Sequence, residues 1–180
     1  MIRVQQYKNF GNVSKGRLFL NKELLPRWAM KCPDGSDILF VGEHKYWCYH
    51  SLFNNPAKLC NFFTLDTHPG GGDQPVPDYN MSIETCDALE SDRFTMVIMI
   101  GVFEYLDHFS DMAVPQINRI LKKGGVAIFA MTGKGEYDDN RGMADFDVYD
   151  RLKPLRVIEN YSIYENSDKP NSVVAVAEKI

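Results

Sequence analysis

The sequence predicts a single α/β domain built on a doubly wound, mostly parallel, seven-stranded sheet. Three observations lead to this prediction. Short apolar runs alternate with segments of helical periodicity, which is the pattern of repeated βαβ units. The central runs are apolar at nearly every position, which is typical of strands covered on both faces. The last two runs flank a turn-forming segment, so we expect a C-terminal antiparallel hairpin.

Length and composition agree with one folded domain over residues 1–180. The chain has 180 residues, of which 44% are hydrophobic and 24% charged. These values are those of globular proteins rather than of disordered chains. Within this domain we expect residues 1–31 to form an N-terminal helical segment that also serves as a lid.

The first half of the chain holds one predicted helix and three predicted strands. Residues 17–31 have apolar positions at helical spacing, and Pro26 should kink or restart that helix because it lacks an N–H group. After a Cys-Pro-Asp-Gly turn, an unbroken apolar run predicts a buried strand over Asp37–Val41. Two further strands are expected over 62–65 and 81–85, separated by a loop too rich in glycine to be regular.

The second half contains the clearest strand. Phe94–Ile100 reads FTMVIMI and is almost wholly apolar, so we expect it at the centre of the sheet. A helix is expected over 110–123, with Ser110 or Asp111 as its cap and the Gly-Gly pair after it as its stop. The remaining expected strands cover 126–131, 155–164 and 172–180.

Charge, hydropathy and cysteine spacing exclude several classes of function. The net charge is −4 and the sequence has no basic cluster, so we expect no nucleic-acid partner. No apolar run approaches the ~20 residues of a membrane helix, and the N-terminus lacks a signal core, so we expect a cytoplasmic protein without a membrane partner. The pattern predicts no particular oligomeric state. The cysteines have neither zinc-ligand nor disulfide-framework spacing, so we expect reduced thiols and no metal at Cys32, Cys48, Cys60 and Cys86.

The predicted topology places a ligand site at the carboxyl ends of the strands. In open parallel sheets, ligands bind in the crevice where the strand order reverses. The first loop at this edge begins at Val41 and Gly42 and runs through Glu43 to Tyr46. A glycine directly after a buried strand lets the backbone approach a ligand or take a positive φ. We therefore expect these four residues to contact the ligand.

Asp66 and Thr67 follow the second predicted strand, 24 residues after Gly42. This separation is close to the ~20 residues at which an acidic side chain reaches the ribose hydroxyls in nucleotide-binding βαβ units. A carboxylate can accept both hydrogen bonds of a vicinal diol. The alternative interpretation is an Asx-type turn made by the same aspartate.

Two later loops complete the predicted crevice. Asp87, which lies between Cys86 and Ala88, could accept a hydrogen bond from an exocyclic amine while neighbouring backbone groups meet a ring nitrogen. The alternative role for Asp87 is that of a helix N-cap. The end of the fourth predicted strand is expected at the crevice floor and consists of Ile100, Gly101 and Val102.

Five segments occur in an order that defines a family pattern over roughly residues 36–131: ILFVG, TLD, CDALE, DRFTMVIMIGVFEYLDH and INRILKKGGVAIF. In this order the chain resembles class I S-adenosylmethionine-dependent methyltransferases. Its first loop keeps one glycine where that family usually has several, which resembles a smaller set of short methyltransferase-like proteins with a Phe-Val-Gly-x-x-x-Tyr loop. The resemblance implies a Rossmann-like fold, S-adenosyl-L-methionine as cofactor, and methyl transfer.

We expect the methyl acceptor to be a small molecule modified on oxygen or nitrogen. Tyr105 and His108 are the candidate catalytic residues, since histidine titrates near neutral pH, and a solvated or capping histidine is the alternative. The acceptor pocket is expected between the stretch 102–108, the acidic segment 131–152 and the aromatic segment 7–19. A solvated charged loop is the alternative for the acidic segment.

Two other classes stay open on the sequence alone. A catalytically inactive cofactor-binding module, or a partner subunit, would keep the crevice, and the altered first loop favours it. A nicotinamide oxidoreductase would need glycines that let a helix N-terminus meet the pyrophosphate. This chain has the bulky residues Tyr46 and Trp47 there, which argues against that class.

Overall fold

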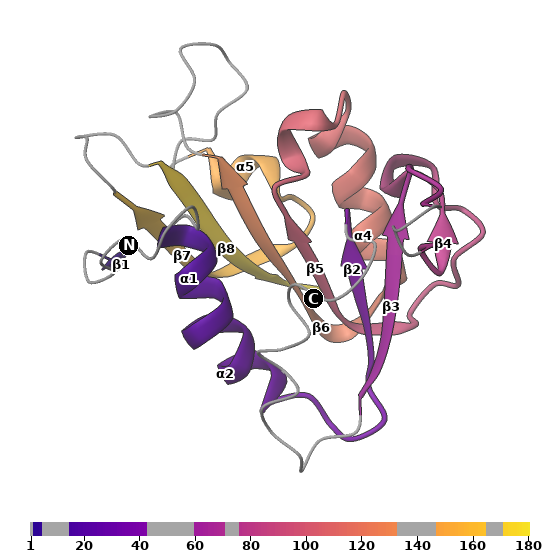
Figure 1. Ribbon diagram of the computed structural model, residues 1–180, viewed down its shortest axis with the longest axis horizontal. Helices are drawn as coiled ribbons and strands as arrows, with labels where there is room; N and C mark the ends of the chain where they lie inside the picture. The colour runs from indigo at the N-terminus through magenta and orange to yellow at the C-terminus, as the bar shows by residue number, and fades with distance from the viewer. Residues whose placement is uncertain (1, 5–14, 43–59, 71–75, 133–146, 165–170) are drawn as a thin grey trace.

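The computed structural model describes residues 2–4, 15–42, 60–70, 76–132, 147–164 and 171–180 (Figure 1). The fold is an eight-stranded mixed sheet in the order β1-β7-β8-β6-β5-β2-β3-β4. The strands are β1 (Ile2–Val4), β2 (Asp37–Val41), β3 (Asn61–Asp66), β4 (Tyr79–Asn80), β5 (Phe94–Ile100), β6 (Leu121–Thr132), β7 (Arg156–Ile163) and β8 (Ser172–Glu178). The helical elements are α1 (Lys15–Phe19), η1 (Leu20–Leu24), α2 (Leu25–Ala29), η2 (Ile83–Thr85), η3 (Phe103–Tyr105), η4 (Phe109–Ala113), α4 (Val114–Ile120) and α5 (Val148–Arg151).

The strand order reverses between β2 and β5. The chain leaves β2 outward through β3 and β4, all in parallel, and then returns to place β5 on the other side of β2. β6 continues the parallel sheet, while β8 pairs antiparallel with both β6 and β7. The predicted doubly wound fold with a C-terminal hairpin is therefore confirmed. Six of the seven expected strands overlap β2, β3, β5, β6, β7 and β8, and β4 takes the place of the strand expected over 81–85. β1 adds an edge strand parallel to β7.

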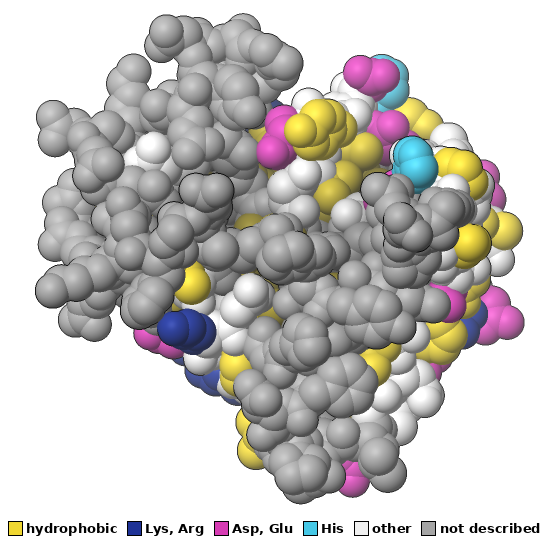
Figure 2. Space-filling model, viewed as in Figure 1, with side chains coloured by type: hydrophobic (Ala, Val, Ile, Leu, Met, Phe, Trp, Pro, Cys, Tyr) yellow, Lys and Arg dark blue, Asp and Glu magenta, His cyan; other side chains and the backbone are white. Residues whose placement is uncertain are grey.

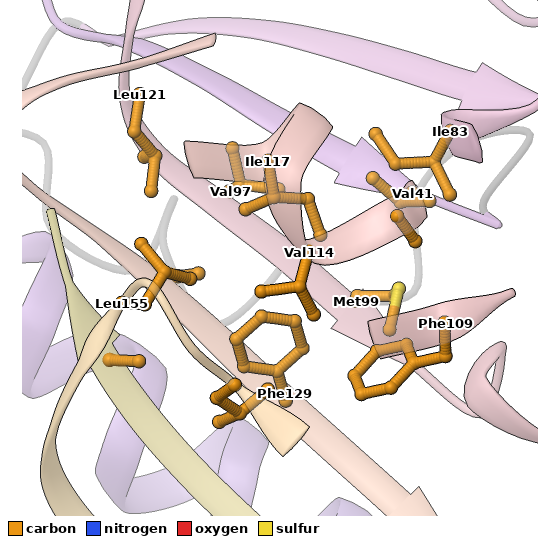
Figure 3. Close-up of a cluster of buried hydrophobic side chains, with 14 of the residues drawn as sticks. Val41, Ile83, Val97, Met99, Phe109, Val114, Ile117, Leu121, Phe129 and Leu155 are labelled. Atoms are coloured by element: carbon orange, nitrogen blue, oxygen red, sulfur yellow. The ribbon is translucent and has the colours of Figure 1, made fainter. Parts of the chain in front are cut away.

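Two apolar cores cover the two faces of the sheet. Alternate residues of a strand point to opposite faces, so in β5 Val97 and Met99 join one core whereas Met96 and Ile98 join the other. Figure 3 shows the first core, in which side chains from β5, β6, η4 and α4 point toward one another. The second core is covered by α1, η1 and α2, which cross the front of the sheet in Figure 1.

The N-terminal helical segment is interrupted near Pro26, as its sequence predicts. Leu20–Leu24 forms a π-helical turn between two α-helical pieces, and Pro26 lies in the first turn of α2. Proline cannot donate a backbone hydrogen bond and its ring crowds the carbonyl of the preceding turn. The wider π turn placed just before Pro26 accommodates this loss while the segment keeps its buried face, which includes Leu20, Leu24 and Leu25.

The third predicted strand was misplaced. β4 is only Tyr79–Asn80, and part of the expected strand 81–85 is instead the 3₁₀ turn η2. The cause is Ser82, whose hydroxyl accepts a hydrogen bond from the backbone N–H of Glu84 at 3.2 Å and so begins a turn. A local side-chain bond of this kind competes with the sheet hydrogen bonds. The loop that follows β4 therefore starts earlier than expected.

The predicted helix over 110–123 also differs at both ends. Its first turn is the π turn η4, whose N-cap residue is His108, and neither Ser110 nor Asp111 is the cap. α4 ends at Ile120, because Leu121 takes an extended conformation and pairs with Phe94 of β5. The two lysines before the Gly-Gly pair thus belong to the irregular start of β6 rather than to the helix.

Three further properties concern the described residues only. None of their helices is long and apolar enough to cross a membrane. They contain no group of three or more His, Cys, Asp or Glu side chains placed to hold a metal ion. Cys32, Cys60 and Cys86 are free thiols, and Cys48 lies outside the described residues.

Candidate functional site

A cavity of about 500 Å³ opens at the carboxyl ends of β2, β3 and β5, where the strand order reverses. We call it the switch-point cavity. Parallel sheets bind ligands at this place because the loops on either side diverge. The residues predicted from the sequence that line it are Val41, Gly42, Asp66, Thr67, Gly101, Val102 and Tyr105.

Gly42 follows β2 with a φ of +75°, a conformation that strains any residue with a Cβ. Its N–H donates to the carbonyl of Leu65 at 2.7 Å, which holds the loop start against β3. A Cβ added here would lie 2.1 Å from Cγ2 of Val102, an impossible contact. Glycine is therefore required both by the backbone conformation and by the side chain that approaches from the end of β5.

Asp66, the last residue of β3, lines the cavity and also forms a local turn. Its Oδ1 accepts a hydrogen bond from the N–H of His68 at 2.8 Å. The Nδ2 of Asn80 donates to the carbonyls of Asp66 and Thr67, each at 3.0 Å. The Asx-type turn expected as the alternative for Asp66 is therefore present, and its bond holds the carboxylate at the cavity wall.

A second set of hydrogen bonds joins Asp78, which lies just before β4, to Thr64 of β3. Oδ2 of Asp78 accepts from the N–H of Thr64 at 2.8 Å and from its hydroxyl at 3.0 Å. The N–H of Asp78 in turn donates to Oγ1 of Thr64 at 3.0 Å. Thr64 is fully buried in β3, so these bonds also satisfy a buried hydroxyl. The short strand β4 is therefore anchored to β3 by side chains as well as by its ladder.

The loop holding Cys86, Asp87 and Ala88 does not reach either cavity described in this section. Oδ1 of Asp87 accepts from Nε2 of Gln116 on α4 at 2.6 Å. Arg119 of the same helix donates to the carbonyls of Cys86 at 2.9 Å and Leu89 at 2.6 Å. Burial raises the pKa of the Cys86 thiol, which Arg119 partly opposes. This loop is thus fastened to α4, away from the switch-point cavity.

Residues that sequence reasoning missed take the place of this loop at the cavity. They are Leu65, Met81, Ser82, Ile83, Glu84 and Leu106. Leu65 lies in β3 one residue before Asp66, and the next four residues follow directly from the early end of β4. The signal that could have revealed them is Ser82 two residues before Glu84, because a serine in this position commonly starts a turn.

A second cavity, of about 250 Å³, lies beside η4, and we call it the η4 cavity. It shares Leu106 with the switch-point cavity. The two candidate catalytic residues divide between the two cavities. The exposed Tyr105 lines the switch-point cavity, whereas His108 lines the η4 cavity. Figure 2 shows histidine and acidic side chains gathered with hydrophobic ones along the upper edge of this face.

Glu84 connects the two cavities. It lines the switch-point cavity, and its Oε1 accepts a hydrogen bond from the backbone N–H of His108 at 2.7 Å. His108 is the N-cap residue of η4 and has no side-chain cap bond of its own. A free N–H at the start of a helical segment needs such an acceptor. The carboxylate of Glu84 therefore fixes the segment that carries His108.

The remaining predicted residues are placed as follows. Ile100 is buried at the end of β5 and does not line the switch-point cavity. Glu43 and Tyr46 lie outside the described residues, as do 133–146 and most of the aromatic segment 7–19. From the acidic segment 131–152, Arg151 at the end of α5 lines the η4 cavity.

No protein-family model and no curated protein matches the sequence, but solved structures do match the fold. The N-methyltransferase NodS from Bradyrhizobium japonicum, solved with S-adenosylhomocysteine, is 16% identical with a TM-score of 0.68 over 93% of this chain and 89% of that chain. The 1,6-didemethyltoxoflavin-N1-methyltransferase from Burkholderia thailandensis is 9% identical with a TM-score of 0.66, over 92% and 78%. The CurJ carbon methyltransferase is 13% identical with a TM-score of 0.64 over 91% of this chain, which spans about half (54%) of that longer chain. At these identities the similarity establishes the fold.

Proposed function

We propose that this chain, which has the fold of the class I S-adenosylmethionine-dependent methyltransferases, binds S-adenosyl-L-methionine in the switch-point cavity and methylates a small molecule. The observation that carries the proposal is the joint placement of Gly42 and Asp66 at one cavity where the strand order reverses. A glycine with positive φ and a carboxylate at the end of the next strand suit the close approach and the diol of an adenosyl ligand.

The residues at the cavity suit the ribose and the adenine of that ligand. Asp66 is placed to accept hydrogen bonds from the ribose hydroxyls. Glu84 is the carboxylate that we assign to the exocyclic amine of adenine, since Glu84 lines the cavity and Asp87 does not. Ile83 and Val102 offer apolar walls to the ring. The volume of about 500 Å³ lies within the range of cofactor sites.

The cofactor would supply an electrophilic methyl group, and the protein would supply position. A lone pair of the acceptor forms the new bond to the methyl carbon while the sulfur–carbon bond breaks, and the proton of the acceptor passes to a base or to water. We include Tyr105 and His108 as candidate bases, because Tyr105 lines the switch-point cavity and His108 lines the η4 cavity. A general base contributes about 10²–10⁴-fold to such a rate. Comparison of the turnover of His108→Ala with that of Tyr105→Phe shows which of the two residues supplies this contribution.

The test of the proposal is calorimetric titration of the purified protein with S-adenosylmethionine, S-adenosylhomocysteine and NAD. We expect the two adenosyl compounds to bind and NAD not to bind. Absence of binding by both adenosyl compounds would overturn the proposal. Binding without methylation of any metabolite in a cell extract would instead assign the chain to the inactive binding modules.

Gly42→Ala tests where the ligand binds. The substitution adds a Cβ against Val102 at a positive φ, so we expect loss of S-adenosylhomocysteine binding. Gly35→Ala is the matched control, because Gly35 has the same φ of +75° but no atom within 4 Å of an added Cβ. Normal binding by Gly42→Ala, at unchanged melting temperature, would place the ligand elsewhere.

A further inference from the structure

The η4 cavity carries opposite charges on walls from different elements. Arg151 comes from α5, while Asp107 and Asp111 flank His108 at the start of η4, and Glu104 of η3 adds a third carboxylate to the lining. The cavity volume of about 250 Å³ suits a molecule much smaller than the cofactor. Because the cavity shares Leu106 with the switch-point cavity, a molecule bound in it lies next to the proposed cofactor site.

Arg151 is not paired with the two aspartates of this cavity. Among the described residues, Arg151 forms no ion pair with Asp107 or Asp111, and its guanidinium instead lies 5.7 Å from the ring centroid of the buried Phe103. Elsewhere in the molecule opposite charges do close up, as Lys179 and Asp92 do at 2.6 Å. Even Asp150, the neighbour of Arg151 on α5, pairs with Lys153 at 2.9 Å.

Opposite charges held apart across a small cavity favour one chemical class of ligand. A guanidinium binds a carboxylate through two parallel hydrogen bonds, and carboxylates bind an ammonium group. A simple anion would meet the aspartates, and a simple cation would meet Arg151. A molecule that carries both charges satisfies both walls, while Phe103, Leu106 and Phe109 offer apolar contact to its carbon atoms.

We propose that the η4 cavity binds a small zwitterion of the α-amino acid class. Its carboxylate would pair with Arg151 and its ammonium group with Asp107 and Asp111. If the chain transfers methyl groups as proposed above, this zwitterion is the methyl acceptor. His108 lines the same cavity, which places the candidate base beside the acceptor rather than beside the cofactor.

The test is an NMR titration of the ¹⁵N-labelled protein, saturated with S-adenosylhomocysteine, with each of the standard amino acids. For the amino acid that binds best, the corresponding amine without the carboxylate and the N-acetylated acid are titrated as matched probes. We expect both probes to bind at least ~10-fold more weakly, because each leaves one charged wall without a partner. Equal binding of the amine, or no amino acid bound below ~10 mM, would overturn the proposal.

Four variants locate the site. Arg151→Gln and Asp111→Asn should each weaken amino-acid binding ~10-fold or more and leave S-adenosylhomocysteine affinity and melting temperature unchanged. Arg156→Gln and Asp150→Asn are the matched controls, since Arg156 pairs with Glu178 and Asp150 with Lys153 away from the cavity. Unchanged amino-acid binding by Arg151→Gln contradicts the proposal.

The same titration separates this inference from the proposed function. If S-adenosylhomocysteine binds and no amino acid does, only the inference fails. If S-adenosylhomocysteine does not bind, the proposed function fails, and the amino-acid titration is repeated on the free protein. Selective amino-acid binding in that case supports the η4 cavity as a zwitterion site that is independent of methyl transfer.

Discussion

Asp66 ends β3, and Asp87 lies in the segment that follows β4, yet only the first of these two aspartates lines the switch-point cavity. Asp66 ends β3, and its carboxylate is held at the cavity wall by a bond from the backbone of His68. Asp87 lies seven residues after β4, and its carboxylate is taken by Gln116 on α4. The difference shows that the hydrogen-bond donors around an aspartate determine where its carboxylate lies, as much as its distance from the end of a strand does.

The anchors of the two loops also differ in kind. The Asp66 loop is held by the amide of Asn80, which bonds only to backbone carbonyls and leaves the carboxylate oriented to the cavity. The Asp87 loop is held by Arg119 of α4, whose guanidinium donates to the backbone carbonyls of Cys86 and Leu89. Four substitutions test whether the first loop serves ligand binding and the second serves stability.

The largest effect is expected from Arg119→Met. This change removes the guanidinium bonds to the carbonyls of Cys86 and Leu89. The Cys86 carbonyl keeps the bond from the N–H of Leu89, so it loses one charge-assisted bond, about 1.5–3 kcal/mol, whereas the Leu89 carbonyl loses its donor, about 1–3 kcal/mol. We expect the free energy of unfolding to fall by about 2–4 kcal/mol in urea denaturation. Arg156→Met, at an exposed ion pair, should cost no more than about 1 kcal/mol. An equal loss of unfolding free energy in the two variants would show that Arg119 does not anchor this loop.

Asp66→Ala is expected to have the next largest effect. Hydrogen bonds to charged groups contribute about 1.5–3 kcal/mol each, so loss of the diol acceptor should lower S-adenosylhomocysteine affinity at least ~10-fold. Calorimetry measures this change, and the melting temperature should remain near that of the wild type. A folded variant with wild-type affinity would show that Asp66 serves the turn alone.

Asn80→Ala should have a smaller effect on the same quantity. It removes the two bonds to the backbone of Asp66 and Thr67 without touching the carboxylate. An ordinary hydrogen bond contributes about 0.5–1.5 kcal/mol, so we expect a loss of cofactor affinity of about 2- to 10-fold. In turnover assays the KM for S-adenosylmethionine should rise while kcat stays constant. A fall in kcat at constant KM would contradict a role in holding the ribose side.

Asp87→Ala is expected to have the smallest effect on binding. Its carboxylate is directed to Gln116, so S-adenosylhomocysteine affinity should change by less than ~2-fold. Calorimetry under the same conditions as for Asp66→Ala gives the direct comparison. A tenfold loss would restore Asp87 as the acceptor for the exocyclic amine and reverse the contrast between the loops.

The parts of the structure that sequence could predict are those determined by local pattern. The apolar runs of β2 and β5 are unbroken, so their burial and central position follow from the sequence. The position of Asp66 at the edge of the cavity could be predicted because it comes at the carboxyl end of a predicted strand. Strand β4 could not, because two residues carry no periodicity and the turn at Ser82 is decided by a single hydroxyl.

Contacts between distant residues account for what the sequence could not show. The bond from His108 to Glu84 joins positions 24 residues apart, and the sequence around neither residue predicts this contact. The bonds of Arg119 go to backbone carbonyls, which every residue possesses. The η4 cavity likewise depends on α5 reaching the start of η4, a tertiary contact with no local signature.

The position of β8 determines how the sheet can open. This strand lies between β6 and β7 and pairs with both, and its residues Val173–Ala177 are fully buried. Among the strands that the structure describes, only β8 joins β7 and β1 to the rest of the sheet. Release of β8 therefore frees β7 and β1 in the same event, so these three strands form one cooperative unit. Their amide hydrogens should exchange with solvent at a common free energy of opening, whereas β3 and β4, at the other edge, can open independently.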